Sequence, residues 1–116
     1  MNDFRKLKVW KKAVQLATDI FKTTEKYPKS ELYGLTSQIR RSVVSISSNI
    51  AEGAGRGSQK EFQQFLNISM GSCYELETQL TISRNLEYVG EKDFIKLRRE
   101  LVEIQKMLYS LVKRIR

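Results

Sequence analysis

Apolar residues recur at alternating steps of three and four along most of the chain, which is the spacing of one face of an α-helix. This pattern predicts four helices, over residues 7–26, 31–54, 58–86 and 91–115. The last of them carries the most sustained series, and that seam consists of Phe94, Leu97, Leu101, Ile104, Leu108, Leu111 and Ile115. A strand over residues 43–47 would fit local propensity, but the helical spacing of the whole second segment favours a helix.

The other three segments carry comparable apolar stripes, which we expect to form the core. In residues 7–26 the predicted buried stripe consists of Leu7, Trp10, Val14, Ala17 and Phe21. In residues 31–54 it consists of Leu35, Ile39, Val43, Ile46, Ile50 and Ala54. In residues 58–86 it consists of Phe62, Phe65, Leu66, Ser69, Cys73, Leu76 and Leu80.

Proline and glycine mark where the first two helices are expected to end. Pro28 disfavours helical geometry at the residue before it and removes a backbone donor. Gly53, Gly55 and Gly57 then end the second helix, because glycine suits left-handed helix ends and turns. Glycine-rich loops can also cradle phosphate, but this spacing matches neither phosphate-binding fingerprint. The cluster is therefore interpreted as a helix-breaking turn.

The third helix has a clear start and an unusual middle. Ser58 and Glu61 fit a capping box, in which each side chain satisfies the backbone amide of the other. Gly71 in the helix interior costs about 1 kcal/mol relative to alanine, so we expect a neighbouring helix to approach closely there. Short connections favour antiparallel neighbours. The predicted fold is all-α, an antiparallel up-down-up-down four-helix bundle that forms a single domain over residues 1–116.

The charge of the chain is strongly unbalanced and suggests an anionic partner. Lysine and arginine number 21 against 13 aspartate and glutamate residues, so the net charge is +8. Such an excess on a small protein favours RNA or DNA as partner, the alternative being a solvated surface that happens to be basic. Basic residues cluster in the first and last helices. The candidates for phosphate contact are Lys8, Lys12, Arg99, Lys106, Lys113 and Arg114.

The residue inventory excludes most catalytic and metal chemistry. The chain has no histidine, so Ser-His-Asp and Cys-His nucleophiles and Glu-x-x-His di-iron pairs are excluded. Its one cysteine, Cys73, cannot form an internal disulfide or build a zinc site. Cys73 falls on the apolar face and is interpreted as a core residue, the alternative being a reactive thiol. We predict no enzymatic activity, no metal and no cofactor.

No segment of the sequence looks like a targeting or membrane element. The first ten residues carry three cations but no apolar run follows them, as a signal peptide would require. No stretch approaches the ~18 apolar residues of a membrane span. Together with the single cysteine, these features predict a cytoplasmic protein with no membrane partner.

One polar stripe of the second helix differs from an ordinary solvated face. Its residues fall within about 100° of arc at the pitch of an α-helix, and they are Gln38, Arg41, Ser45, Ser48, Asn49, Glu52 and Arg56. A merely solvated face is usually rich in Lys and Glu, whereas Arg, Asn, Ser and Gln make directed hydrogen bonds. We predict that the stripe mediates self-association through Arg41, Ser45, Asn49, Glu52 and Arg56.

The same residues carry a family resemblance over nearly the whole chain. The segments that carry it are Phe4-Arg5-Lys6-Leu7-Lys8-Val9-Trp10-Lys11-Lys12-Ala13, Tyr33-Gly34-Leu35, Gln38-Ile39-Arg40-Arg41-Ser42, Ser45-Ile46, Ser48-Asn49-Ile50-Ala51-Glu52-Gly53, Arg56, Phe62, Phe65-Leu66, Gly71-Ser72, Glu75-Leu76 and Gln79-Leu80. They resemble the four-helix-bundle proteins encoded in intervening sequences of bacterial large-subunit ribosomal RNA. A common alanine after the paired arginines is Ser42 here, which is a minor departure.

The resemblance implies a bundle fold, a bacterial origin and an oligomer. The family is also similar to the accessory protein of diversity-generating retroelements, a basic ring-shaped pentamer that works with a reverse transcriptase and nucleic acid. The first hypothesis is therefore a non-enzymatic homo-oligomer, with a pentamer favoured, that binds RNA or DNA. The alternative is a protein-interaction scaffold or an accessory subunit of a nucleic-acid enzyme such as a reverse transcriptase, without direct nucleic-acid binding.

Overall fold

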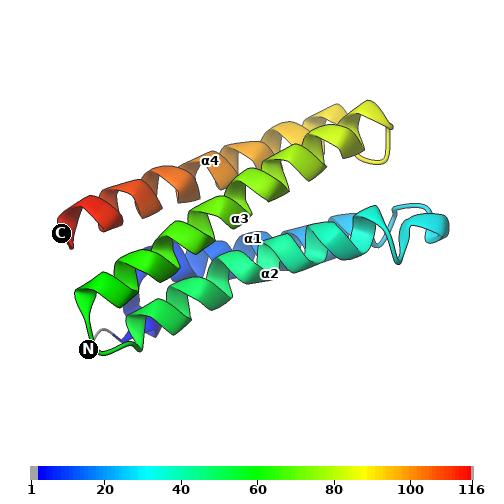
Figure 1. Ribbon diagram of the computed structural model, residues 1–116. Coiled ribbons are helices and arrows are strands. Elements are labelled where there is room, and N and C mark those ends of the chain that lie inside the picture. Colours follow the sequence, from blue (N-terminus) through cyan, green and yellow to red (C-terminus); the bar gives the residue numbers. More distant parts are fainter. Residues whose placement is uncertain (1–2, 116) are drawn as a thin grey trace.

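The computed structural model describes residues 3–115 and contains four α-helices and two short 3₁₀ turns, with no strand in that range. The helices are α1 (Lys8–Thr24), α2 (Leu35–Ala54), α3 (Gln59–Asn85) and α4 (Glu91–Arg114) (Figure 1). The 3₁₀ turns span Phe4–Lys6 and Lys29–Glu31. The single-domain prediction also covers residues 1, 2 and 116, which lie outside the described residues.

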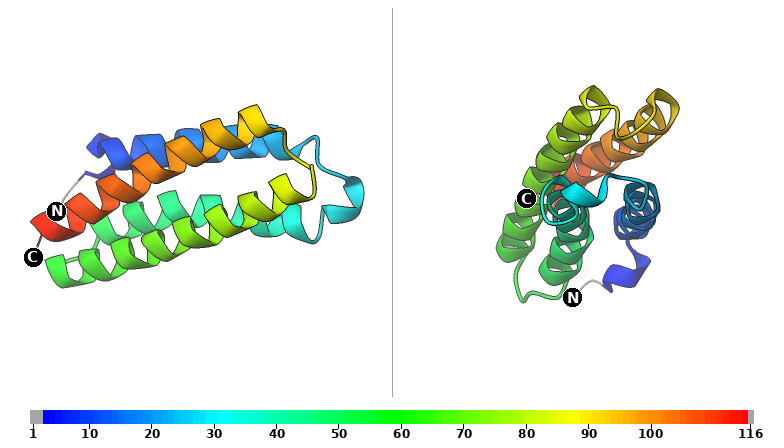
Figure 2. Two further views of the ribbon diagram at one scale, coloured as in Figure 1. Left: turned by 90° about the horizontal axis from the view of Figure 1, so that it is seen from above. Right: turned by 90° about the vertical axis from the view of Figure 1, so that its right-hand side faces the viewer.

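The helices form an elongated antiparallel bundle of 43 × 24 × 20 Å. Each helix runs opposite to the one before it, and α1 begins at the same end of the bundle where α4 ends (Figure 2). α1 packs against α2 and α4, and α3 packs against the same two helices. This arrangement confirms the predicted all-α fold with up-down-up-down order.

The start of α2 differs from the sequence prediction by about a turn. Residues Lys29–Glu31 form a 3₁₀ turn, and the α-helix begins only at Leu35. Gly34, at the N-cap position, has no side chain that could accept a hydrogen bond. The Glu31 carboxylate accepts one from the Leu35 amide instead, at 3.3 Å. The carboxylate thus caps the helix that it was predicted to begin.

The start of α3 agrees with the prediction in its essential half. The Ser58 hydroxyl oxygen accepts from the Glu61 amide at 3.1 Å. The hydroxyl also donates to the Glu61 carboxylate at 3.2 Å, so that carboxylate is bound by the side chain of Ser58 rather than by its backbone amide. The cap is formed, but without the reciprocal backbone bond of a complete capping box.

The core follows the predicted stripes of α2, α3 and α4 closely. Ile39, Val43, Ile46 and Ile50 of α2 have no exposed surface. In α4 the entire seam from Phe94 to Leu111 is buried, and Ile115 is partly buried against it. The sustained three-and-four spacing therefore identified the buried face correctly in these helices.

The predicted buried face of α1 is correct only in part, because Leu7, Trp10 and Ala17 pack against the core but are only partly buried. The residues that enter the core are Val9, Ala13, Leu16 and Ile20. Val14 and Phe21, from the predicted stripe, are 37% and 38% exposed. They lie on the flank of α1 beside α2, where the Arg40 guanidinium sits 4.8 Å above the Phe21 ring. The error arises because α1 carries two apolar stripes of the same spacing, roughly 100° apart around the helix.

The glycine that permits a close helix approach is Gly53 rather than Gly71. A Cβ added at Gly53 would lie 2.7 Å from the Phe65 Cβ and 3.0 Å from the Phe62 ring. Gly71 is exposed, and a Cβ there would meet nothing within 4 Å. The glycine cluster does end α2, yet no glycine among residues 3–115 has a positive φ, and Gly55 closes the helix at −83°. The left-handed helix end that we predicted is absent there.

Small residues hold α2 and α3 together more closely than any other pair of helices in residues 3–115. The Ser45 and Ser72 hydroxyls share a hydrogen bond of 2.8 Å across the interface. The buried Ser69 hydroxyl donates to the Ile46 carbonyl at 2.8 Å. Short side chains let the two backbones approach, and their polar atoms are satisfied by the neighbouring helix.

Candidate nucleic-acid interface

Three of the six predicted phosphate-binding residues converge on one groove between α1 and α4. Lys8 from α1 and Lys106 and Arg114 from α4 line a hollow of about 440 Å³ near the end of the bundle where α1 begins. All three are exposed. The packing of α1 against α4 brings together cations that are about a hundred residues apart in the sequence.

Lys12 lies beside this groove but is bound to an acidic neighbour. Its ammonium group contacts the Glu103 carboxylate at 2.6 Å, which links α1 to α4. The hydrogen bond and the charge of Lys12 lower the pKa of Glu103, and the charges of Lys8 and Lys106 lower it further. A carboxylate stabilised by three surrounding cations reports a positive local potential, which is the condition for attracting phosphate.

The two remaining candidates extend the basic surface along α4. Arg99, Lys106 and Lys113 are seven residues apart, so they form one exposed row on the outer side of the helix. The Lys113 ammonium lies 5.2 Å from the centre of the Tyr109 ring. The six predicted residues therefore form two groups. Lys8, Lys12, Lys106 and Arg114 lie at or beside the groove, and Arg99, Lys106 and Lys113 form the row, so Lys106 belongs to both.

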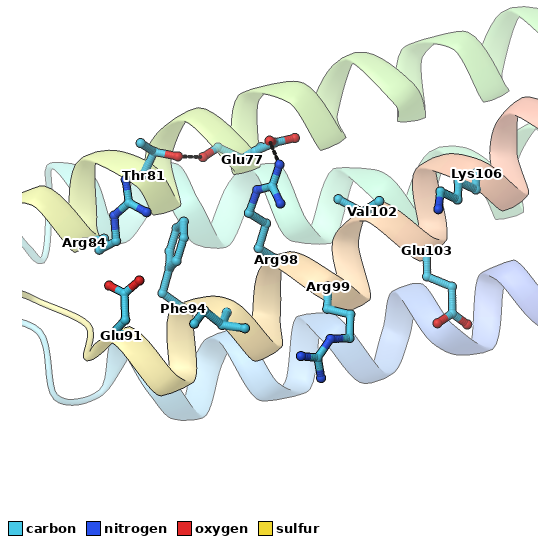
Figure 3. A pocket seen from close by; sticks show the side chains of 11 residues that line it. Glu77, Thr81, Arg84, Glu91, Phe94, Arg98, Arg99, Val102, Glu103 and Lys106 are labelled. Carbon is cyan, nitrogen blue, oxygen red and sulfur yellow. Dashed lines mark hydrogen bonds and ion pairs between the residues drawn. The ribbon is translucent and has the colours of Figure 1, made fainter.

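Sequence reasoning missed a second groove, between α3 and α4, with a volume of about 800 Å³ (Figure 3). Arg98 of α4 points across it to the Glu77 carboxylate at 3.3 Å. The Arg84 guanidinium lies 4.4 Å above the Phe94 ring. Arg98 flanks the predicted seam at Leu97, which is a signal that could have identified it, whereas no pattern in the sequence pairs Arg84 with α4.

The predicted self-association stripe is used in part within the chain itself. The Asn49 amide donates to the Ser45 carbonyl at 2.8 Å and to the Ser45 hydroxyl at 2.9 Å. Glu52 and Arg56 pair at 3.2 Å along their own helix end, and the Arg56 guanidinium also lies 4.9 Å above the Phe65 ring. Ser45 and Asn49 thus support the α2–α3 contact.

Among the charged residues of the stripe, Arg41 is exposed and forms no ion pair within residues 3–115. It lines a polar hollow of about 500 Å³ between α2 and α3, together with Gln79. The buried side-chain oxygen of Gln79 has no hydrogen-bond partner among the described residues. This hollow therefore presents an exposed donor, Arg41, while the unsatisfied acceptor of Gln79 lies below the surface.

The structure offers little for nucleophilic or metal chemistry. Within residues 3–115 no three metal-ligating side chains come together. Cys73 is buried, and desolvation, followed by the charge of Glu77, raises the pKa of its thiol to about 12. Such a thiol is not ionised near neutral pH, which supports its interpretation as a core residue. None of the helices in the described range has the length and hydropathy needed to cross a membrane.

These features define a class: small, basic four-helix-bundle proteins. The chain belongs to the 23S rRNA-intervening sequence protein family, whose model matches residues 5–110. The match covers all four helices except the end of α4.

A solved structure agrees with this family and fold. A protein of unknown function from the S23 ribosomal protein family of Bacteroides thetaiotaomicron is similar, with 27% sequence identity and a TM-score of 0.84. The similarity covers 90% of this chain and 95% of the other. Among curated proteins no relative matches the sequence. No enzyme family is indicated by these matches.

Proposed function

We propose that this protein is a non-enzymatic, basic homo-oligomer that binds RNA or DNA through the groove between α1 and α4. The single observation that carries the proposal is the convergence of Lys8, Lys106 and Arg114 on that groove. A merely solvated basic surface would spread its cations and pair them with nearby carboxylates. Here the one carboxylate of the groove, Glu103, is already paired with Lys12.

The chemistry of the groove suits phosphate contact without base recognition. Flexible lysine and arginine side chains at its rim neutralise phosphates and release counterions, which supplies most of non-specific affinity. Its floor contains Leu7 and Met107, which offer no hydrogen bonds to base edges. We therefore expect weak sequence preference, in keeping with a role defined by charge and shape.

Salt-dependent binding tests this function directly. The affinity for a fluorescently labelled single-stranded RNA is measured by anisotropy at several salt concentrations. The logarithm of the association constant is expected to fall with the logarithm of salt, at a slope near −0.7 per neutralised phosphate. Charge reversal at Lys106 and Lys113 should make that slope shallower, and reversal at Lys8 should act in the same direction.

A charge-matched control separates the groove from net charge alone. Lys92→Glu makes the same charge change on α4 as Lys106→Glu, but at the opposite end of the helix. If the two variants weaken binding equally, the attraction is diffuse and the groove is not the site. A wild-type protein that binds neither RNA nor DNA at low salt would refute the function and leave the scaffold alternative.

The oligomeric part of the proposal places the interface at the α2 stripe, in a pentamer. Arg41 lines an open polar hollow and forms no ion pair within residues 3–115, so an acidic group of a neighbouring subunit could pair with it. A ring requires head-to-tail contacts, in which one patch meets a different patch of the neighbour. Five basic subunits would also present many phosphate contacts at once, which strengthens binding to a polyanion.

Light scattering coupled to size exclusion tests the assembly. The wild-type protein should have the mass of five subunits at micromolar concentration, and Arg41→Ala and Arg56→Ala should each shift the mass toward smaller species. Lys92→Ala, at an exposed cation near the start of α4 that lines neither groove, is the control. A wild-type mass of one subunit would rule out the assembly. An oligomer unaffected by Arg41→Ala, Asn49→Ala and Arg56→Ala would place the interface elsewhere.

A further inference from the structure

α4 carries a second heptad row on its exposed side. Ile95, Val102 and Tyr109 are seven residues apart, the same interval as in the buried seam of this helix. Ile95 is 46% exposed, Tyr109 is 62% exposed and Val102 is half-buried. A helix with apolar rows on two sides normally has helical neighbours on two sides. Only the buried seam has its neighbours in the described chain.

α3 supplies the facing wall of the same surface. Tyr74 and Ile82, both largely exposed, line a shallow hollow on α3. This hollow shares Glu77 and Thr81 with the larger groove between α3 and α4, so the two adjoin on α3. The groove itself contains Ile95 and Val102 of α4, and the exposed row continues to Tyr109, about 21 Å along that helix.

We propose that the α3–α4 groove docks an amphipathic helix of a partner protein, with acidic residues flanking its apolar face. The apolar face would contact Ile95 and Val102. The acidic flanks would meet Arg84 and Arg99, which form no ion pair within residues 3–115. This mode of recognition places an apolar stripe in a groove between helices and uses charges at the rim for orientation.

The composition of the groove favours a protein over a nucleic acid. Ile95 and Val102 are the exposed or half-buried apolar side chains of the groove, and as aliphatic groups they offer bases neither a stacking platform nor a hydrogen bond. Glu91 also lines the groove, forms no ion pair within residues 3–115 and would oppose a continuous phosphate backbone there. A helix can place its charges selectively. Arginine and tyrosine are also enriched at the centres of protein interfaces.

Charge favours a different protein over a second copy of this chain. Each copy carries a net charge of +8. The net charge opposes the association of two copies, whereas it attracts an acidic helix. Arg99 and Lys106 belong both to this groove and to the proposed nucleic-acid surface, but the proposal requires neither nucleic-acid binding nor the oligomer.

A defined peptide provides the probe. It is a capped peptide of about 18 residues, long enough to span the exposed row of α4, with leucine at heptad positions and glutamate beside them. Binding of the labelled peptide is measured by fluorescence anisotropy, with affinity expected at about 1–100 μM. A scrambled peptide of the same composition and a version with lysine in place of glutamate should each bind at least about tenfold more weakly.

Matched variants of the protein locate the site. Ile95→Ser and Arg99→Gln should each weaken peptide binding by about tenfold. The controls are Ile68→Ser, at an exposed isoleucine that lines neither hollow, and Lys60→Gln at the start of α3. Both controls should bind like the wild type, and circular dichroism verifies that every variant is folded.

Several outcomes would overturn the proposal. They include no difference between the designed and scrambled peptides, and equal effects of Ile95→Ser and Ile68→Ser. If single-stranded RNA displaces the peptide and its affinity falls in Ile95→Ser, the groove is a nucleic-acid site. If Ile95→Ser lowers the mass of the assembly in light scattering, the groove is filled by a second copy.

Discussion

Replacing Gly53 with alanine should destabilise the bundle, although alanine is the better helix former. The added Cβ would lie 2.7 Å from the Phe65 Cβ, and an unstrained carbon contact is about 3.5–4.0 Å. Both atoms are attached directly to backbone, so no rotamer change can relieve the overlap. α2 and α3 must separate by roughly 1 Å. Such overpacking costs about 1–3 kcal/mol, against a propensity gain of at most about 1 kcal/mol.

Gly71→Ala is the matched control, because a Cβ at that position meets nothing within 4 Å. It should stabilise the protein by about 0.5–1 kcal/mol. The difference between the two variants therefore isolates the overpacking, about 1–3 kcal/mol. Urea unfolding followed by circular dichroism measures both, at one fixed protein concentration because assembly adds to apparent stability. Equal stabilisation by both substitutions would refute the close approach at Gly53.

Three further predictions concern the core, the thiol and pH. Leu101→Ala and Leu108→Ala remove side chains that have no exposed surface, so each should lower the free energy of unfolding in urea by about 2–5 kcal/mol. A loss below ~0.5 kcal/mol at both positions would mean that the seam does not face the core. Cys73, with a pKa of about 12, should not react with Ellman's reagent at pH 8 until denaturant is added, and fast labelling of the folded protein would contradict its burial. Lys12 lowers the pKa of Glu103 in the folded state, so this pair stabilises the protein above the unfolded pKa of glutamate and loses that effect as the pH falls through the folded pKa. Glu103→Gln should therefore reduce the difference between the urea midpoints at neutral and acid pH. The reduction should be small because both side chains are about half exposed, and an unchanged difference would show that the pair does not contribute to stability.

The sequence predicted helix positions and most buried faces because single apolar stripes leave one choice. In α4 the buried seam runs from Phe94 to Leu111. The only other apolar row of this helix, Ile95, Val102 and Tyr109, has far fewer residues, so the seam was easily identified as the buried face. α1 offered two stripes, and only the docking of α2 and α4 decides that Leu16 is buried and Val14 is not. That choice is a property of the assembled bundle, which local periodicity does not contain.

The candidate surfaces were predictable only in part, for a related reason. Lys8, Lys106 and Arg114 could be named from charge, but their convergence depends on how α1 lies against α4. We predicted a close helix approach at Gly71, but it occurs at Gly53, because the sequence around a helical glycine does not show which residues of other helices pack against it. Gly71 is mid-helix and free, while Gly53 lies against Phe65 across an interface. Ser45 and Asn49, which we predict to face a neighbouring subunit, also form hydrogen bonds within the chain that periodicity alone did not indicate.

The serine contacts between α2 and α3 also bear on how the molecule folds and opens. These helices are joined by only four residues, 55–58, so their contacts close short loops and form at low entropic cost. Amides in this hairpin, near Ile46 and Ser69, should exchange with deuterium only through global unfolding. α4 packs less closely on α1 and α3 and should exchange through smaller openings. Both proposed binding surfaces include α4, so a bound RNA or partner helix would show first as slowed exchange in that helix.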